Sequence, residues 1–243
     1  MKIDINGVRV ISFEETDSTN TRAKELAKEG YNRPCLLVAE QQTQGRGRMG
    51  RSFYSPENTG LYMSYLYKAE GDFSDIVTVT GAAAVAVLRS IKELTDKEPK
   101  IKWVNDILID GKKVCGILTE TVTDKNGVTS VIVGIGINVS TNLFPEDIKS
   151  VAGSLGVDLP KDVLAKTIVK HLQGLILGLK QRTFIEDYIK HSSVLGKDVV
   201  YTIKGVEYTA KAVEIDNNGG LVVMDENGDR KTLSTGEISV KSV

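Results

Sequence analysis

The sequence predicts an α+β fold, in which an antiparallel meander at the centre of a sheet packs against helices and a small β-barrel domain follows. Residues 101–137 hold consecutive β-rich segments joined by short turn signals, a pattern typical of a meander and unlike a parallel Rossmann sheet. Helical patterns lie on both sides of these segments. From Val194 onward, about five brief strands alternate with turn pairs, so the expected domains are residues 1–193 and 194–243.

The N-terminal part is expected to alternate between strand and helix. Residues 8–13 are apolar and β-branched, which predicts a strand, and residues 35–39 predict a short buried one. Between them an amphipathic helix should run from the cap residues at 17–19 to about residue 29, with Gly30 ending it. Residues 61–67 predict a further strand, with Leu61, Met63, Tyr65 and Tyr67 on one face.

The central and C-terminal elements follow from composition and spacing. A long helix is expected over residues 73–95, because its centre, GAAAVAVLRSI, is small and apolar enough to be buried against the sheet. Turn signals at Asp110-Gly111 and at residues 124–127 separate the meander strands. Residues 140–160 are irregular, which is typical of a functional loop. Apolar residues at helical spacing from Leu164 to Leu179 mark one face of another helix.

Composition limits the classes of function. With 41% hydrophobic residues in 243, the chain can bury a core, and no stretch reaches the roughly 20 apolar residues of a membrane span. Lys and Arg number 31 against 32 Asp and Glu, which argues against general nucleic-acid binding. Cys35 and Cys115 lie in apolar runs and are expected to be buried and reduced, in a cytoplasmic protein. His171 lies beside an apolar helical stripe and is expected to be a surface or core residue, and His191 has no partner in view. Neither a metal site nor histidine catalysis is therefore expected.

The segment from Glu40 to Arg51, EQQTQGRGRMGR, interleaves three arginines with three glycines and contains one apolar residue, Met49. Its cations repel one another unless an anion sits among them, and glycine lets backbone N–H groups approach a ligand. We expect this arginine loop (residues 43–59) to be mobile until a ligand with several anionic oxygens, such as a phosphate, binds it. A solvated basic loop and a nucleic-acid patch are the alternatives.

Three further motifs accompany the loop: Ser18-Thr19-Asn20 at an expected helix start, KWVNDILIDGKKVCGIL at 102–118, and GIGIN at 134–138. Each also has a purely structural interpretation. Ser18 is either a helix cap or a hydroxyl presented to a ligand, and the two roles can coexist because a helix start directs donors outward. By itself, Lys113 would be a hairpin lysine pointing to water, and Trp103 would be a core residue.

In this order and spacing, the motifs resemble those of biotin–protein ligases: STN, a GRGR-x-GR loop, KW-x-ND followed by a lysine and GIL, and G-x-GIN. The resemblance runs from about Thr16 to the C-terminus and includes LSTGEISV at 233–240. It implies a mixed, largely antiparallel sheet flanked by helices, similar to that of class II aminoacyl-tRNA synthetases, with an SH3-like C-terminal barrel. It also implies ATP-dependent activation of biotin to biotinyl-5′-AMP, then transfer to a lysine of a biotin carboxyl carrier protein.

The resemblance assigns residues to both substrates. For biotin it implies Ser18, Thr19, Asn20, Gln42, Gly45, Arg46, Gly47, Arg48, Lys113, Gly116 and Gly134. For ATP it implies Arg48, Arg51, Lys102, Trp103, Asn105, Asp106 and Asn138. Arg48 and Lys113 are the expected catalytic residues, and Asp106 is the expected contact to the Mg²⁺ that accompanies ATP.

The implied roles within these sets differ. Ser18, Thr19 and Gln42 match positions that hydrogen-bond the ureido end of biotin, while Lys113 reaches the biotin carboxylate and the α-phosphate. Gly116 and Gly134 match sites where a missing side chain leaves room for the ligand. Because the reaction joins two anions, charge neutralisation and positioning serve it without a protein nucleophile.

The sequence departs from the family pattern at three positions. Val104 stands where the family often has proline, Met49 replaces a frequent arginine, and Cys115 occupies a position where small residues are usual. None of these changes removes a residue assigned to chemistry. Many relatives also carry an N-terminal DNA-binding domain, but the 17 residues before Ser18 are too few for the roughly 50 that such a domain needs. Sequence-specific DNA binding is therefore not expected, whereas a homodimer is plausible.

Three rival functions remain open at this point. A lipoate ligase or acyltransferase of the same superfamily would share the fold, but its arginine–glycine signature is not found here. A non-catalytic nucleic-acid-binding protein would use the arginine loop and bind in a strongly salt-dependent way. An adenylate-binding regulator without transfer activity is disfavoured by the intact Lys113 and by the complete C-terminal domain.

Overall fold

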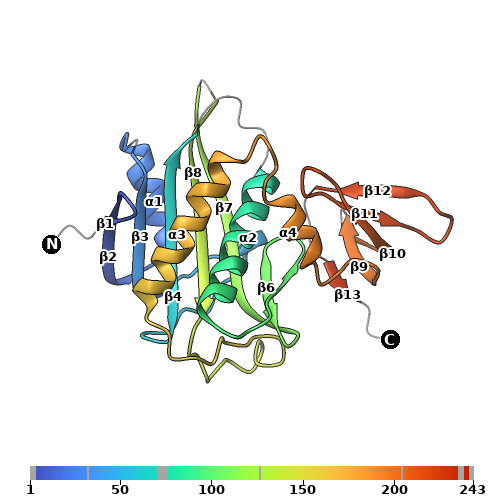
Figure 1. Ribbon diagram of the computed structural model, residues 1–243, viewed down its shortest axis with the longest axis horizontal. Coiled ribbons are helices and arrows are strands. Elements are labelled where there is room, and N and C mark those ends of the chain that lie inside the picture. Colours follow the sequence, from blue (N-terminus) through green and yellow to red (C-terminus); the bar gives the residue numbers. More distant parts are fainter. Residues whose placement is uncertain are drawn as a thin grey trace.

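One eight-stranded mixed sheet organises most of the chain, and a second, antiparallel sheet lies at the C-terminal end (Figure 1). The computed structural model describes residues 4–31, 33–69, 76–125, 127–203, 205–234 and 238–240. The strand order of the large sheet is β1-β2-β3-β4-β8-β7-β6-β5. Helices cover both of its faces, with α2 and α3 on the face that Figure 1 presents and α1 behind it.

The N-terminal elements confirm the expected strand–helix–strand order. They are β1 (Asp4–Ile5), β2 (Val8–Thr16), α1 (Thr19–Lys28), β3 (Cys35–Gln42) and β4 (Gly60–Lys68). Because α1 crosses between them, β2 and β3 run parallel, which makes the sheet mixed. Both strands extend beyond their apolar cores, since the ladder continues through the polar pairs Glu15–Gln41 and Thr16–Gln42. The predicted strands are too short, because the polar residues at their ends do not continue the hydrophobic pattern from which the strands were predicted.

The expected meander is present as β5 (Lys100–Lys102), β6 (Asp106–Ile109), β7 (Lys112–Asp124) and β8 (Gly127–Asn138). All its neighbouring strands are antiparallel, and the turn at Asp110-Gly111 has φ angles of 48° and 76°. The meander runs from β8 in the middle of the sheet to β5 at one edge, rather than occupying the centre alone. The turn residue Asn126 lies outside the described residues.

Three further helices are α2 (Ile76–Leu94), which precedes β5, and α3 (Lys161–Leu177) and the short α4 (Ile185–Lys190), which follow β8. Of these, α2 and α3 were expected. The alanines of α2 are fully buried, and Leu164, Ile168, Leu172 and Leu175 of the predicted α3 stripe are buried. Leu179, the last residue of that predicted stripe, lies beyond the end of α3 and is partly buried. Residues 73–75, where the first of these helices was expected to begin, lie outside the described residues. The six residues of α4 are too few for a periodic signal, and it packs against α2.

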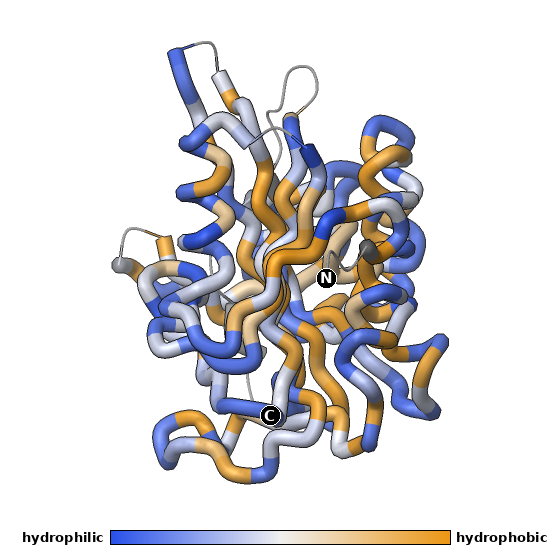
Figure 2. Tube along the Cα trace, turned by 90° about the vertical axis from the view of Figure 1, so that its left-hand side faces the viewer, coloured by the Kyte–Doolittle hydropathy of each residue, from blue (hydrophilic) through white to orange (hydrophobic). Residues whose placement is uncertain are grey.

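The core lies on both faces of the large sheet. The side chains of Leu61, Met63, Tyr65 and Tyr67 share one cluster with α2 and α3, which confirms the predicted face of β4. The opposite face is buried as well, because Leu66 packs in a second cluster with α1. Figure 2 shows the hydrophobic segments concentrated in the central strands, with hydrophilic segments around them. Among the described residues, no helix has the length and hydropathy needed to cross a bilayer.

The C-terminal sheet comprises β9 (Asp198–Ile203), β10 (Val206–Ile215), β11 (Leu221–Met224), β12 (Arg230–Leu233) and β13 (Ile238–Val240). Its order is β12-β11-β10-β9-β13, which confirms five brief antiparallel strands. Among the described residues β12 and β13 stand at opposite edges of this sheet and no pairing joins them, so a closed SH3-like barrel remains a prediction. Residues 235–237 of the LSTGEISV motif, and the turn residue 204, lie outside the described residues.

Candidate active site

A cavity of about 200 Å³ lies between the arginine loop, the start of α1 and strands β5 to β8. Every residue predicted for biotin or ATP lines it, except Gly45 and Asn138. The predicted residues on its wall are Ser18, Thr19, Asn20, Gln42, Arg46, Gly47, Arg48, Arg51, Lys102, Trp103, Asn105, Asp106, Lys113, Gly116 and Gly134. Four motifs that are far apart in sequence therefore meet at one site.

One side of the cavity is a buried polar network at the start of α1. Thr19 donates to Gln42 Oε1 from its backbone N–H (2.8 Å) and its hydroxyl (3.2 Å). Asn20 donates from Nδ2 to Leu118 O (3.2 Å), so its Oδ1 accepts the proton of Ser64, whose Oγ is 2.6 Å away. Ser18 occupies the N-cap position, yet its side chain makes no cap bond. Ser18 also lines the cavity, and its role toward a ligand stays a prediction.

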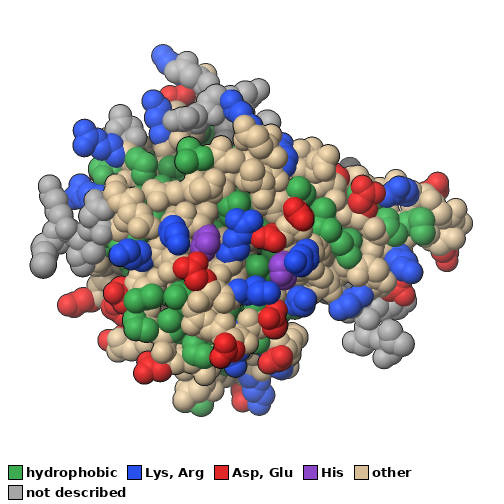
Figure 3. Space-filling view, viewed as in Figure 1, with side chains coloured by type: hydrophobic (Ala, Val, Ile, Leu, Met, Phe, Trp, Pro, Cys, Tyr) green, Lys and Arg blue, Asp and Glu red, His purple; other side chains and the backbone are tan. Residues whose placement is uncertain are grey.

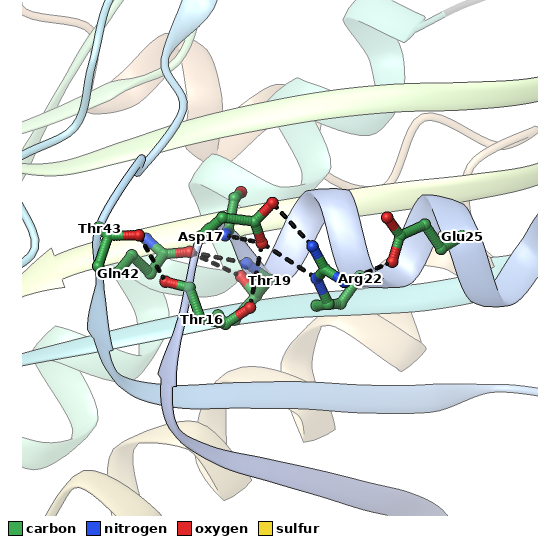
Figure 4. Close-up of polar contacts among 8 residues, drawn as sticks. Thr16, Asp17, Thr19, Arg22, Glu25, Gln42 and Thr43 are labelled. Carbon is green, nitrogen blue, oxygen red and sulfur yellow. Dashed lines mark hydrogen bonds and ion pairs between the residues drawn. The ribbon is translucent and has the colours of Figure 1, made fainter.

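Asp17 fixes the turn from β2 into α1, as Figure 4 shows. Its Oδ1 accepts hydrogen bonds from the backbone N–H of Ser18 (2.6 Å) and from Nε of Arg22 (3.0 Å), while Arg22 Nη2 lies 2.8 Å from Oδ2. The guanidinium of Arg22 holds the pKa of this carboxyl below its ordinary value. The backbone of the turn also receives the arginine loop, because Thr43 N donates to Thr16 O and Gln44 N to Asp17 O.

The arginine loop has a defined backbone. Gly47 N donates to Arg51 O and Phe53 N to Gly45 O, and a single 3-10 turn (Arg48–Gly50) forms its tip. At the tip Met49 has a φ of 54° and is 74% exposed. For Arg46 and Arg48 the expected mutual repulsion is relieved within the chain, because their guanidiniums meet different groups.

Two of these guanidiniums have polar partners on the meander. Arg46 makes a two-pronged contact with the carboxylate of Glu120, with Nη1 at 3.2 Å and Nη2 at 3.1 Å from its oxygens. Arg48, which is half-buried, donates from Nη1 to Asn105 Oδ1 at 3.3 Å. The loop is thereby attached to β7 and to the turn between β5 and β6.

Lys113 and Asp106 form an ion pair on the other side of the cavity, with Nζ 2.7 Å from Oδ1. Asp106 Oδ1 is buried, and the Lys113 ammonium is the partner that compensates its charge. The Lys113 backbone pairs with the irregular segment 140–160, through Val151 O and Gly153 N. That segment therefore braces the hairpin which carries the lysine.

The glycines on the sheet make room for neighbouring side chains. Gly116 and Gly134 also line the cavity, and the room that they leave for a ligand stays a prediction. A Cβ on Gly134 would meet Asn20 at 2.1 Å, and one on Gly136 would meet the Phe53 ring at 2.5 Å. On Gly116 it would lie 3.2 Å from both Phe53 and Lys113. The sequence could not reveal this, because the side chains concerned come from distant segments.

The remaining predicted residues lie at the margins. Trp103 is 4% exposed and donates from Nε1 to Gly219 O, so it belongs to the core as well as to the cavity wall. Gly45 is buried, with a Cβ position only 2.3 Å from Phe53 O, so it shapes the loop from beneath. Asn138 donates to Gly153 O, while its buried Oδ1 has no partner in the described residues.

Sequence reasoning missed several residues of the site. They are Ser52, Phe53, Met63, Ile117, Leu118, Ile135 and Gly136 on the wall, with Ser64 and Glu120 in the polar contacts. Strand alternation offered a signal for some of them, because Leu118 and Glu120 follow Gly116 on the same face of β7. The two histidines have protein partners, Glu93 for His171 and Asp187 O for His191. No cluster of three metal-binding side chains occurs in the described part of the chain.

Comparison with known proteins explains this combination of sheet, arginine loop and cavity. Residues 12–138 match the model of the biotin/lipoate A/B protein ligase family. The bifunctional ligase/repressor BirA of Bacillus subtilis is 35% identical, over 96% of this chain and 75% of its own length. A biotin–[acetyl-CoA-carboxylase] ligase of Mycobacterium tuberculosis is 29% identical, over 92% of this chain and 86% of its own.

A solved structure matches across nearly the whole chain. The biotin protein ligase of Aquifex aeolicus in complex with biotin and ATP has a TM-score of 0.82 and 32% identity, covering 96% of this chain and 99% of that one. The chain belongs to the biotin/lipoate A/B protein ligase family. The relatives named here are biotin ligases, which confirms the resemblance drawn from the motifs and the predicted class of enzyme.

Proposed function

We propose that this protein activates biotin with ATP to biotinyl-5′-AMP and transfers the biotin to a lysine of a biotin carboxyl carrier protein. The main observation behind the proposal is that one cavity has both a polar wall and a cationic wall. A buried polar wall at the start of α1 faces a cationic wall formed by the arginine loop and the hairpin. The biotin and ATP complex of the Aquifex aeolicus relative supports the same pairing of ligands.

In the first step, a carboxylate oxygen of biotin attacks the α-phosphorus of ATP, and the bond to the pyrophosphate breaks. No proton moves, but two anions must approach, so positive charge near the attacking carboxylate and the α-phosphate lowers the barrier. Lys113 and Arg48 are suited to this, because each is only partly exposed and lines the cavity. Arg51 and Lys102, also on the wall, would neutralise the departing pyrophosphate.

In the second step, the amine of the acceptor lysine attacks the carbonyl carbon of the mixed anhydride, and AMP leaves. The amine loses a proton to solvent, and the new bond is an amide. The adenylate must survive until the acceptor arrives, so a site that keeps water from it is needed. The arginine loop lies at the cavity and is the segment that would cover it.

The polar wall suits the ureido ring of biotin, which carries two N–H donors and one carbonyl acceptor. Ser18, Thr19 and Gln42 supply hydroxyl and amide groups at this wall, and Asn20 and Gly134 complete it. Gly47 and Gly116 line the same cavity, while Gly45 supports the loop beneath. For the nucleotide we assign Arg48, Arg51, Lys102, Trp103, Asn105, Asp106 and Asn138, as in the motif analysis.

Magnesium is implied with ATP, and the residues present suit it. Mg²⁺ binds through one or two carboxylates together with phosphate oxygens. Asp106 offers a cavity-lining carboxylate, the ligand type that Mg²⁺ prefers, with its Oδ1 ion-paired to Lys113. When bound, the ion would neutralise phosphate charge, and Asp106 would hold it. Residence in the cytoplasm, the absence of DNA binding and a homodimer remain predictions from the sequence and the family.

The test is to incubate the protein with ATP, Mg²⁺ and biotin, and to look for biotinyl-5′-AMP by mass spectrometry. A parallel reaction with lipoate separates the nearest rival, and adding a biotin carboxyl carrier domain should place biotin on one lysine. The proposal fails if biotin gives no adenylate, or if only lipoate does. Nucleic-acid binding whose affinity is unchanged by biotin and falls steeply with salt concentration would favour the non-catalytic alternative.

A further inference from the structure

Glu120 on β7 joins three elements of the site, although no motif contains it. We propose that Glu120 is a positioning residue for biotin, because it holds Arg46 and Asn20 in place on the polar side of the cavity. This inference rests on the proposed function and adds a residue to it. Glu120 itself does not line the cavity, so it acts through the two residues that do.

Both oxygens of the Glu120 carboxylate are engaged. Oε2 accepts hydrogen bonds from Asn20 Nδ2 at 3.0 Å and from Arg46 Nη1 at 3.2 Å. Oε1 lies 3.1 Å from Arg46 Nη2 and 3.7 Å from the ammonium of Lys24. A carboxylate that meets a guanidinium at two points fixes its plane as well as its position. The Glu120 side chain is 15% exposed and that of Arg46 is 43% exposed, so the carboxylate end of this contact is the sheltered one.

The contact between Glu120 and Asn20 fixes the orientation of the Asn20 side-chain amide, which could otherwise flip and exchange its Oδ1 and Nδ2. Asn20 Nδ2 has two acceptors, Leu118 O and Glu120, which leaves Oδ1 to accept the proton of Ser64. Ser64 is fully buried and also lies 2.7 Å from Thr19 Oγ1. The charge on Glu120 therefore fixes the orientation of the Asn20 amide, and with it the acceptor to which Ser64 donates its proton.

The contact with Arg46 fixes one side of the arginine loop. Arg46 pairs with Ser52 across the base of the loop, next to the tip that carries Arg48. Without Glu120, the Arg46 side chain would lose its anionic partner and gain freedom to move into the cavity. Binding a ligand would then cost the entropy of ordering that side chain again.

The same observations separate a positioning role from a merely structural one. The backbone of Glu120 pairs with Ile132 in the β7–β8 ladder, and a side-chain substitution leaves that pairing in place. The groups that the side chain contacts are polar, and Asn20 and Arg46 belong to the cavity wall. Removing the charge should therefore change ligand binding more than it changes folding.

The experiment measures biotin-dependent ATP–pyrophosphate exchange for the wild type, Glu120→Gln and Glu120→Ala. We expect the KM for biotin to rise about tenfold in Glu120→Gln, since a hydrogen bond to a charged partner is weakened. It should rise further in Glu120→Ala, with the KM for ATP and the thermal unfolding midpoint unchanged. Glu98→Gln is the matched control, because Glu98 also pairs with a cation, Lys92, but outside the cavity.

A double-mutant cycle tests whether the effect passes through Arg46. If it does, the KM for biotin in the double variant Arg46→Gln/Glu120→Gln should exceed that of Arg46→Gln only by the contribution that Glu120 makes through Asn20. Strictly additive losses, or an unchanged KM for biotin in both Glu120 variants, would overturn the inference. A wild-type protein that shows no biotin-dependent exchange would instead refute the proposed function, so the two failures are distinguishable.

Discussion

The indole Nε1 of Trp103 donates a 2.9 Å hydrogen bond to the carbonyl oxygen of Gly219, which connects the cavity wall to the C-terminal sheet. Gly219 lies in the turn between β10 and β11, where Asp216 Oδ1 accepts hydrogen bonds from two backbone N–H groups of the same turn. Arg182 also donates to Asn218 Oδ1. The turn is therefore rigid and held from several sides, so it can fix the position of the indole.

Trp103→Phe should weaken this connection while keeping an aromatic ring in place. The substitution leaves the buried carbonyl of Gly219 without its donor, which costs about 1–3 kcal/mol of unfolding free energy. The measurement is urea unfolding followed by circular dichroism, because Trp103 is the only tryptophan and fluorescence would be lost with it. Leu177→Ala, at a side chain 84% exposed, is the control that should change nothing. An equal free energy of unfolding for the Phe variant and the wild type would show that the hydrogen bond from Trp103 to Gly219 does not stabilise the fold.

Arg48→Ala should slow adenylate formation by about a hundredfold, because a preorganised cation near the developing charge is removed. Stability should change little, since Arg48 is a partly exposed residue of a loop at the cavity wall. Lys113→Gln should behave in the same way. Single-turnover production of biotinyl-5′-AMP measures the effect, and Arg230→Ala, which breaks an exposed ion pair with Glu214, serves as control. Lost thermal stability with normal adenylation would reverse the assignment.

Much of the fold could be predicted from local pattern. The period-two pattern of β4, the stripe of α3 and the glycine turn at residue 111 each encode their own element, so they were found. Family motifs then identified most of the cavity wall. The predicted lengths of β2 and β3 were too short, because polar residues continue their ladders and only the partner strand reveals this.

The rest of the site depends on contacts between residues that are distant in sequence. Arg46 and Glu120 are 74 residues apart, and Trp103 and Gly219 are 116 apart, so no local pattern indicates either contact. Gly136 illustrates the same limit, since the side chain that fills its space is Phe53 from the arginine loop. On the face seen in Figure 3, basic and acidic side chains are interspersed, as the balanced composition of the chain leads one to expect.

Leu172→Ala tests whether the stripe of α3 acts in packing alone. Leu172 is fully buried in the cluster between α2, α3 and the sheet. Removing its side chain should cost about 2–5 kcal/mol, with the kinetic constants at permissive temperature unchanged. Chemical denaturation measures the first quantity and pyrophosphate exchange the second. A selective change in the KM for biotin or ATP would contradict a role limited to packing.

The two cysteines should resist alkylation as long as the protein is folded. Cys35 and Cys115 are both fully buried, and burial raises the pKa of the Cys35 thiol to about 11. Burial also raises the pKa of the Cys115 thiol, so neither residue forms an appreciable amount of thiolate near neutral pH. Iodoacetamide should modify neither thiol in the native state and both in concentrated urea, as read by mass spectrometry. Rapid native labelling of Cys115 would show that β7 opens.

Asp17 should make the stability of the fold depend on pH in the acid range. Its native pKa is lowered by Arg22, whereas in the unfolded chain it should lie near the ordinary value of about 3.9. The stabilisation is therefore complete above that ordinary value and is lost as the pH falls through the lower native pKa. Asp17→Asn should be less stable than the wild type near neutral pH, and the difference should shrink in acid. In an Arg22→Gln background the same substitution should have a smaller effect, because the guanidinium that lowers the pKa is absent. A difference between wild type and Asp17→Asn that stays constant from neutral to acid pH would show that the carboxylate charge at the start of α1 contributes nothing.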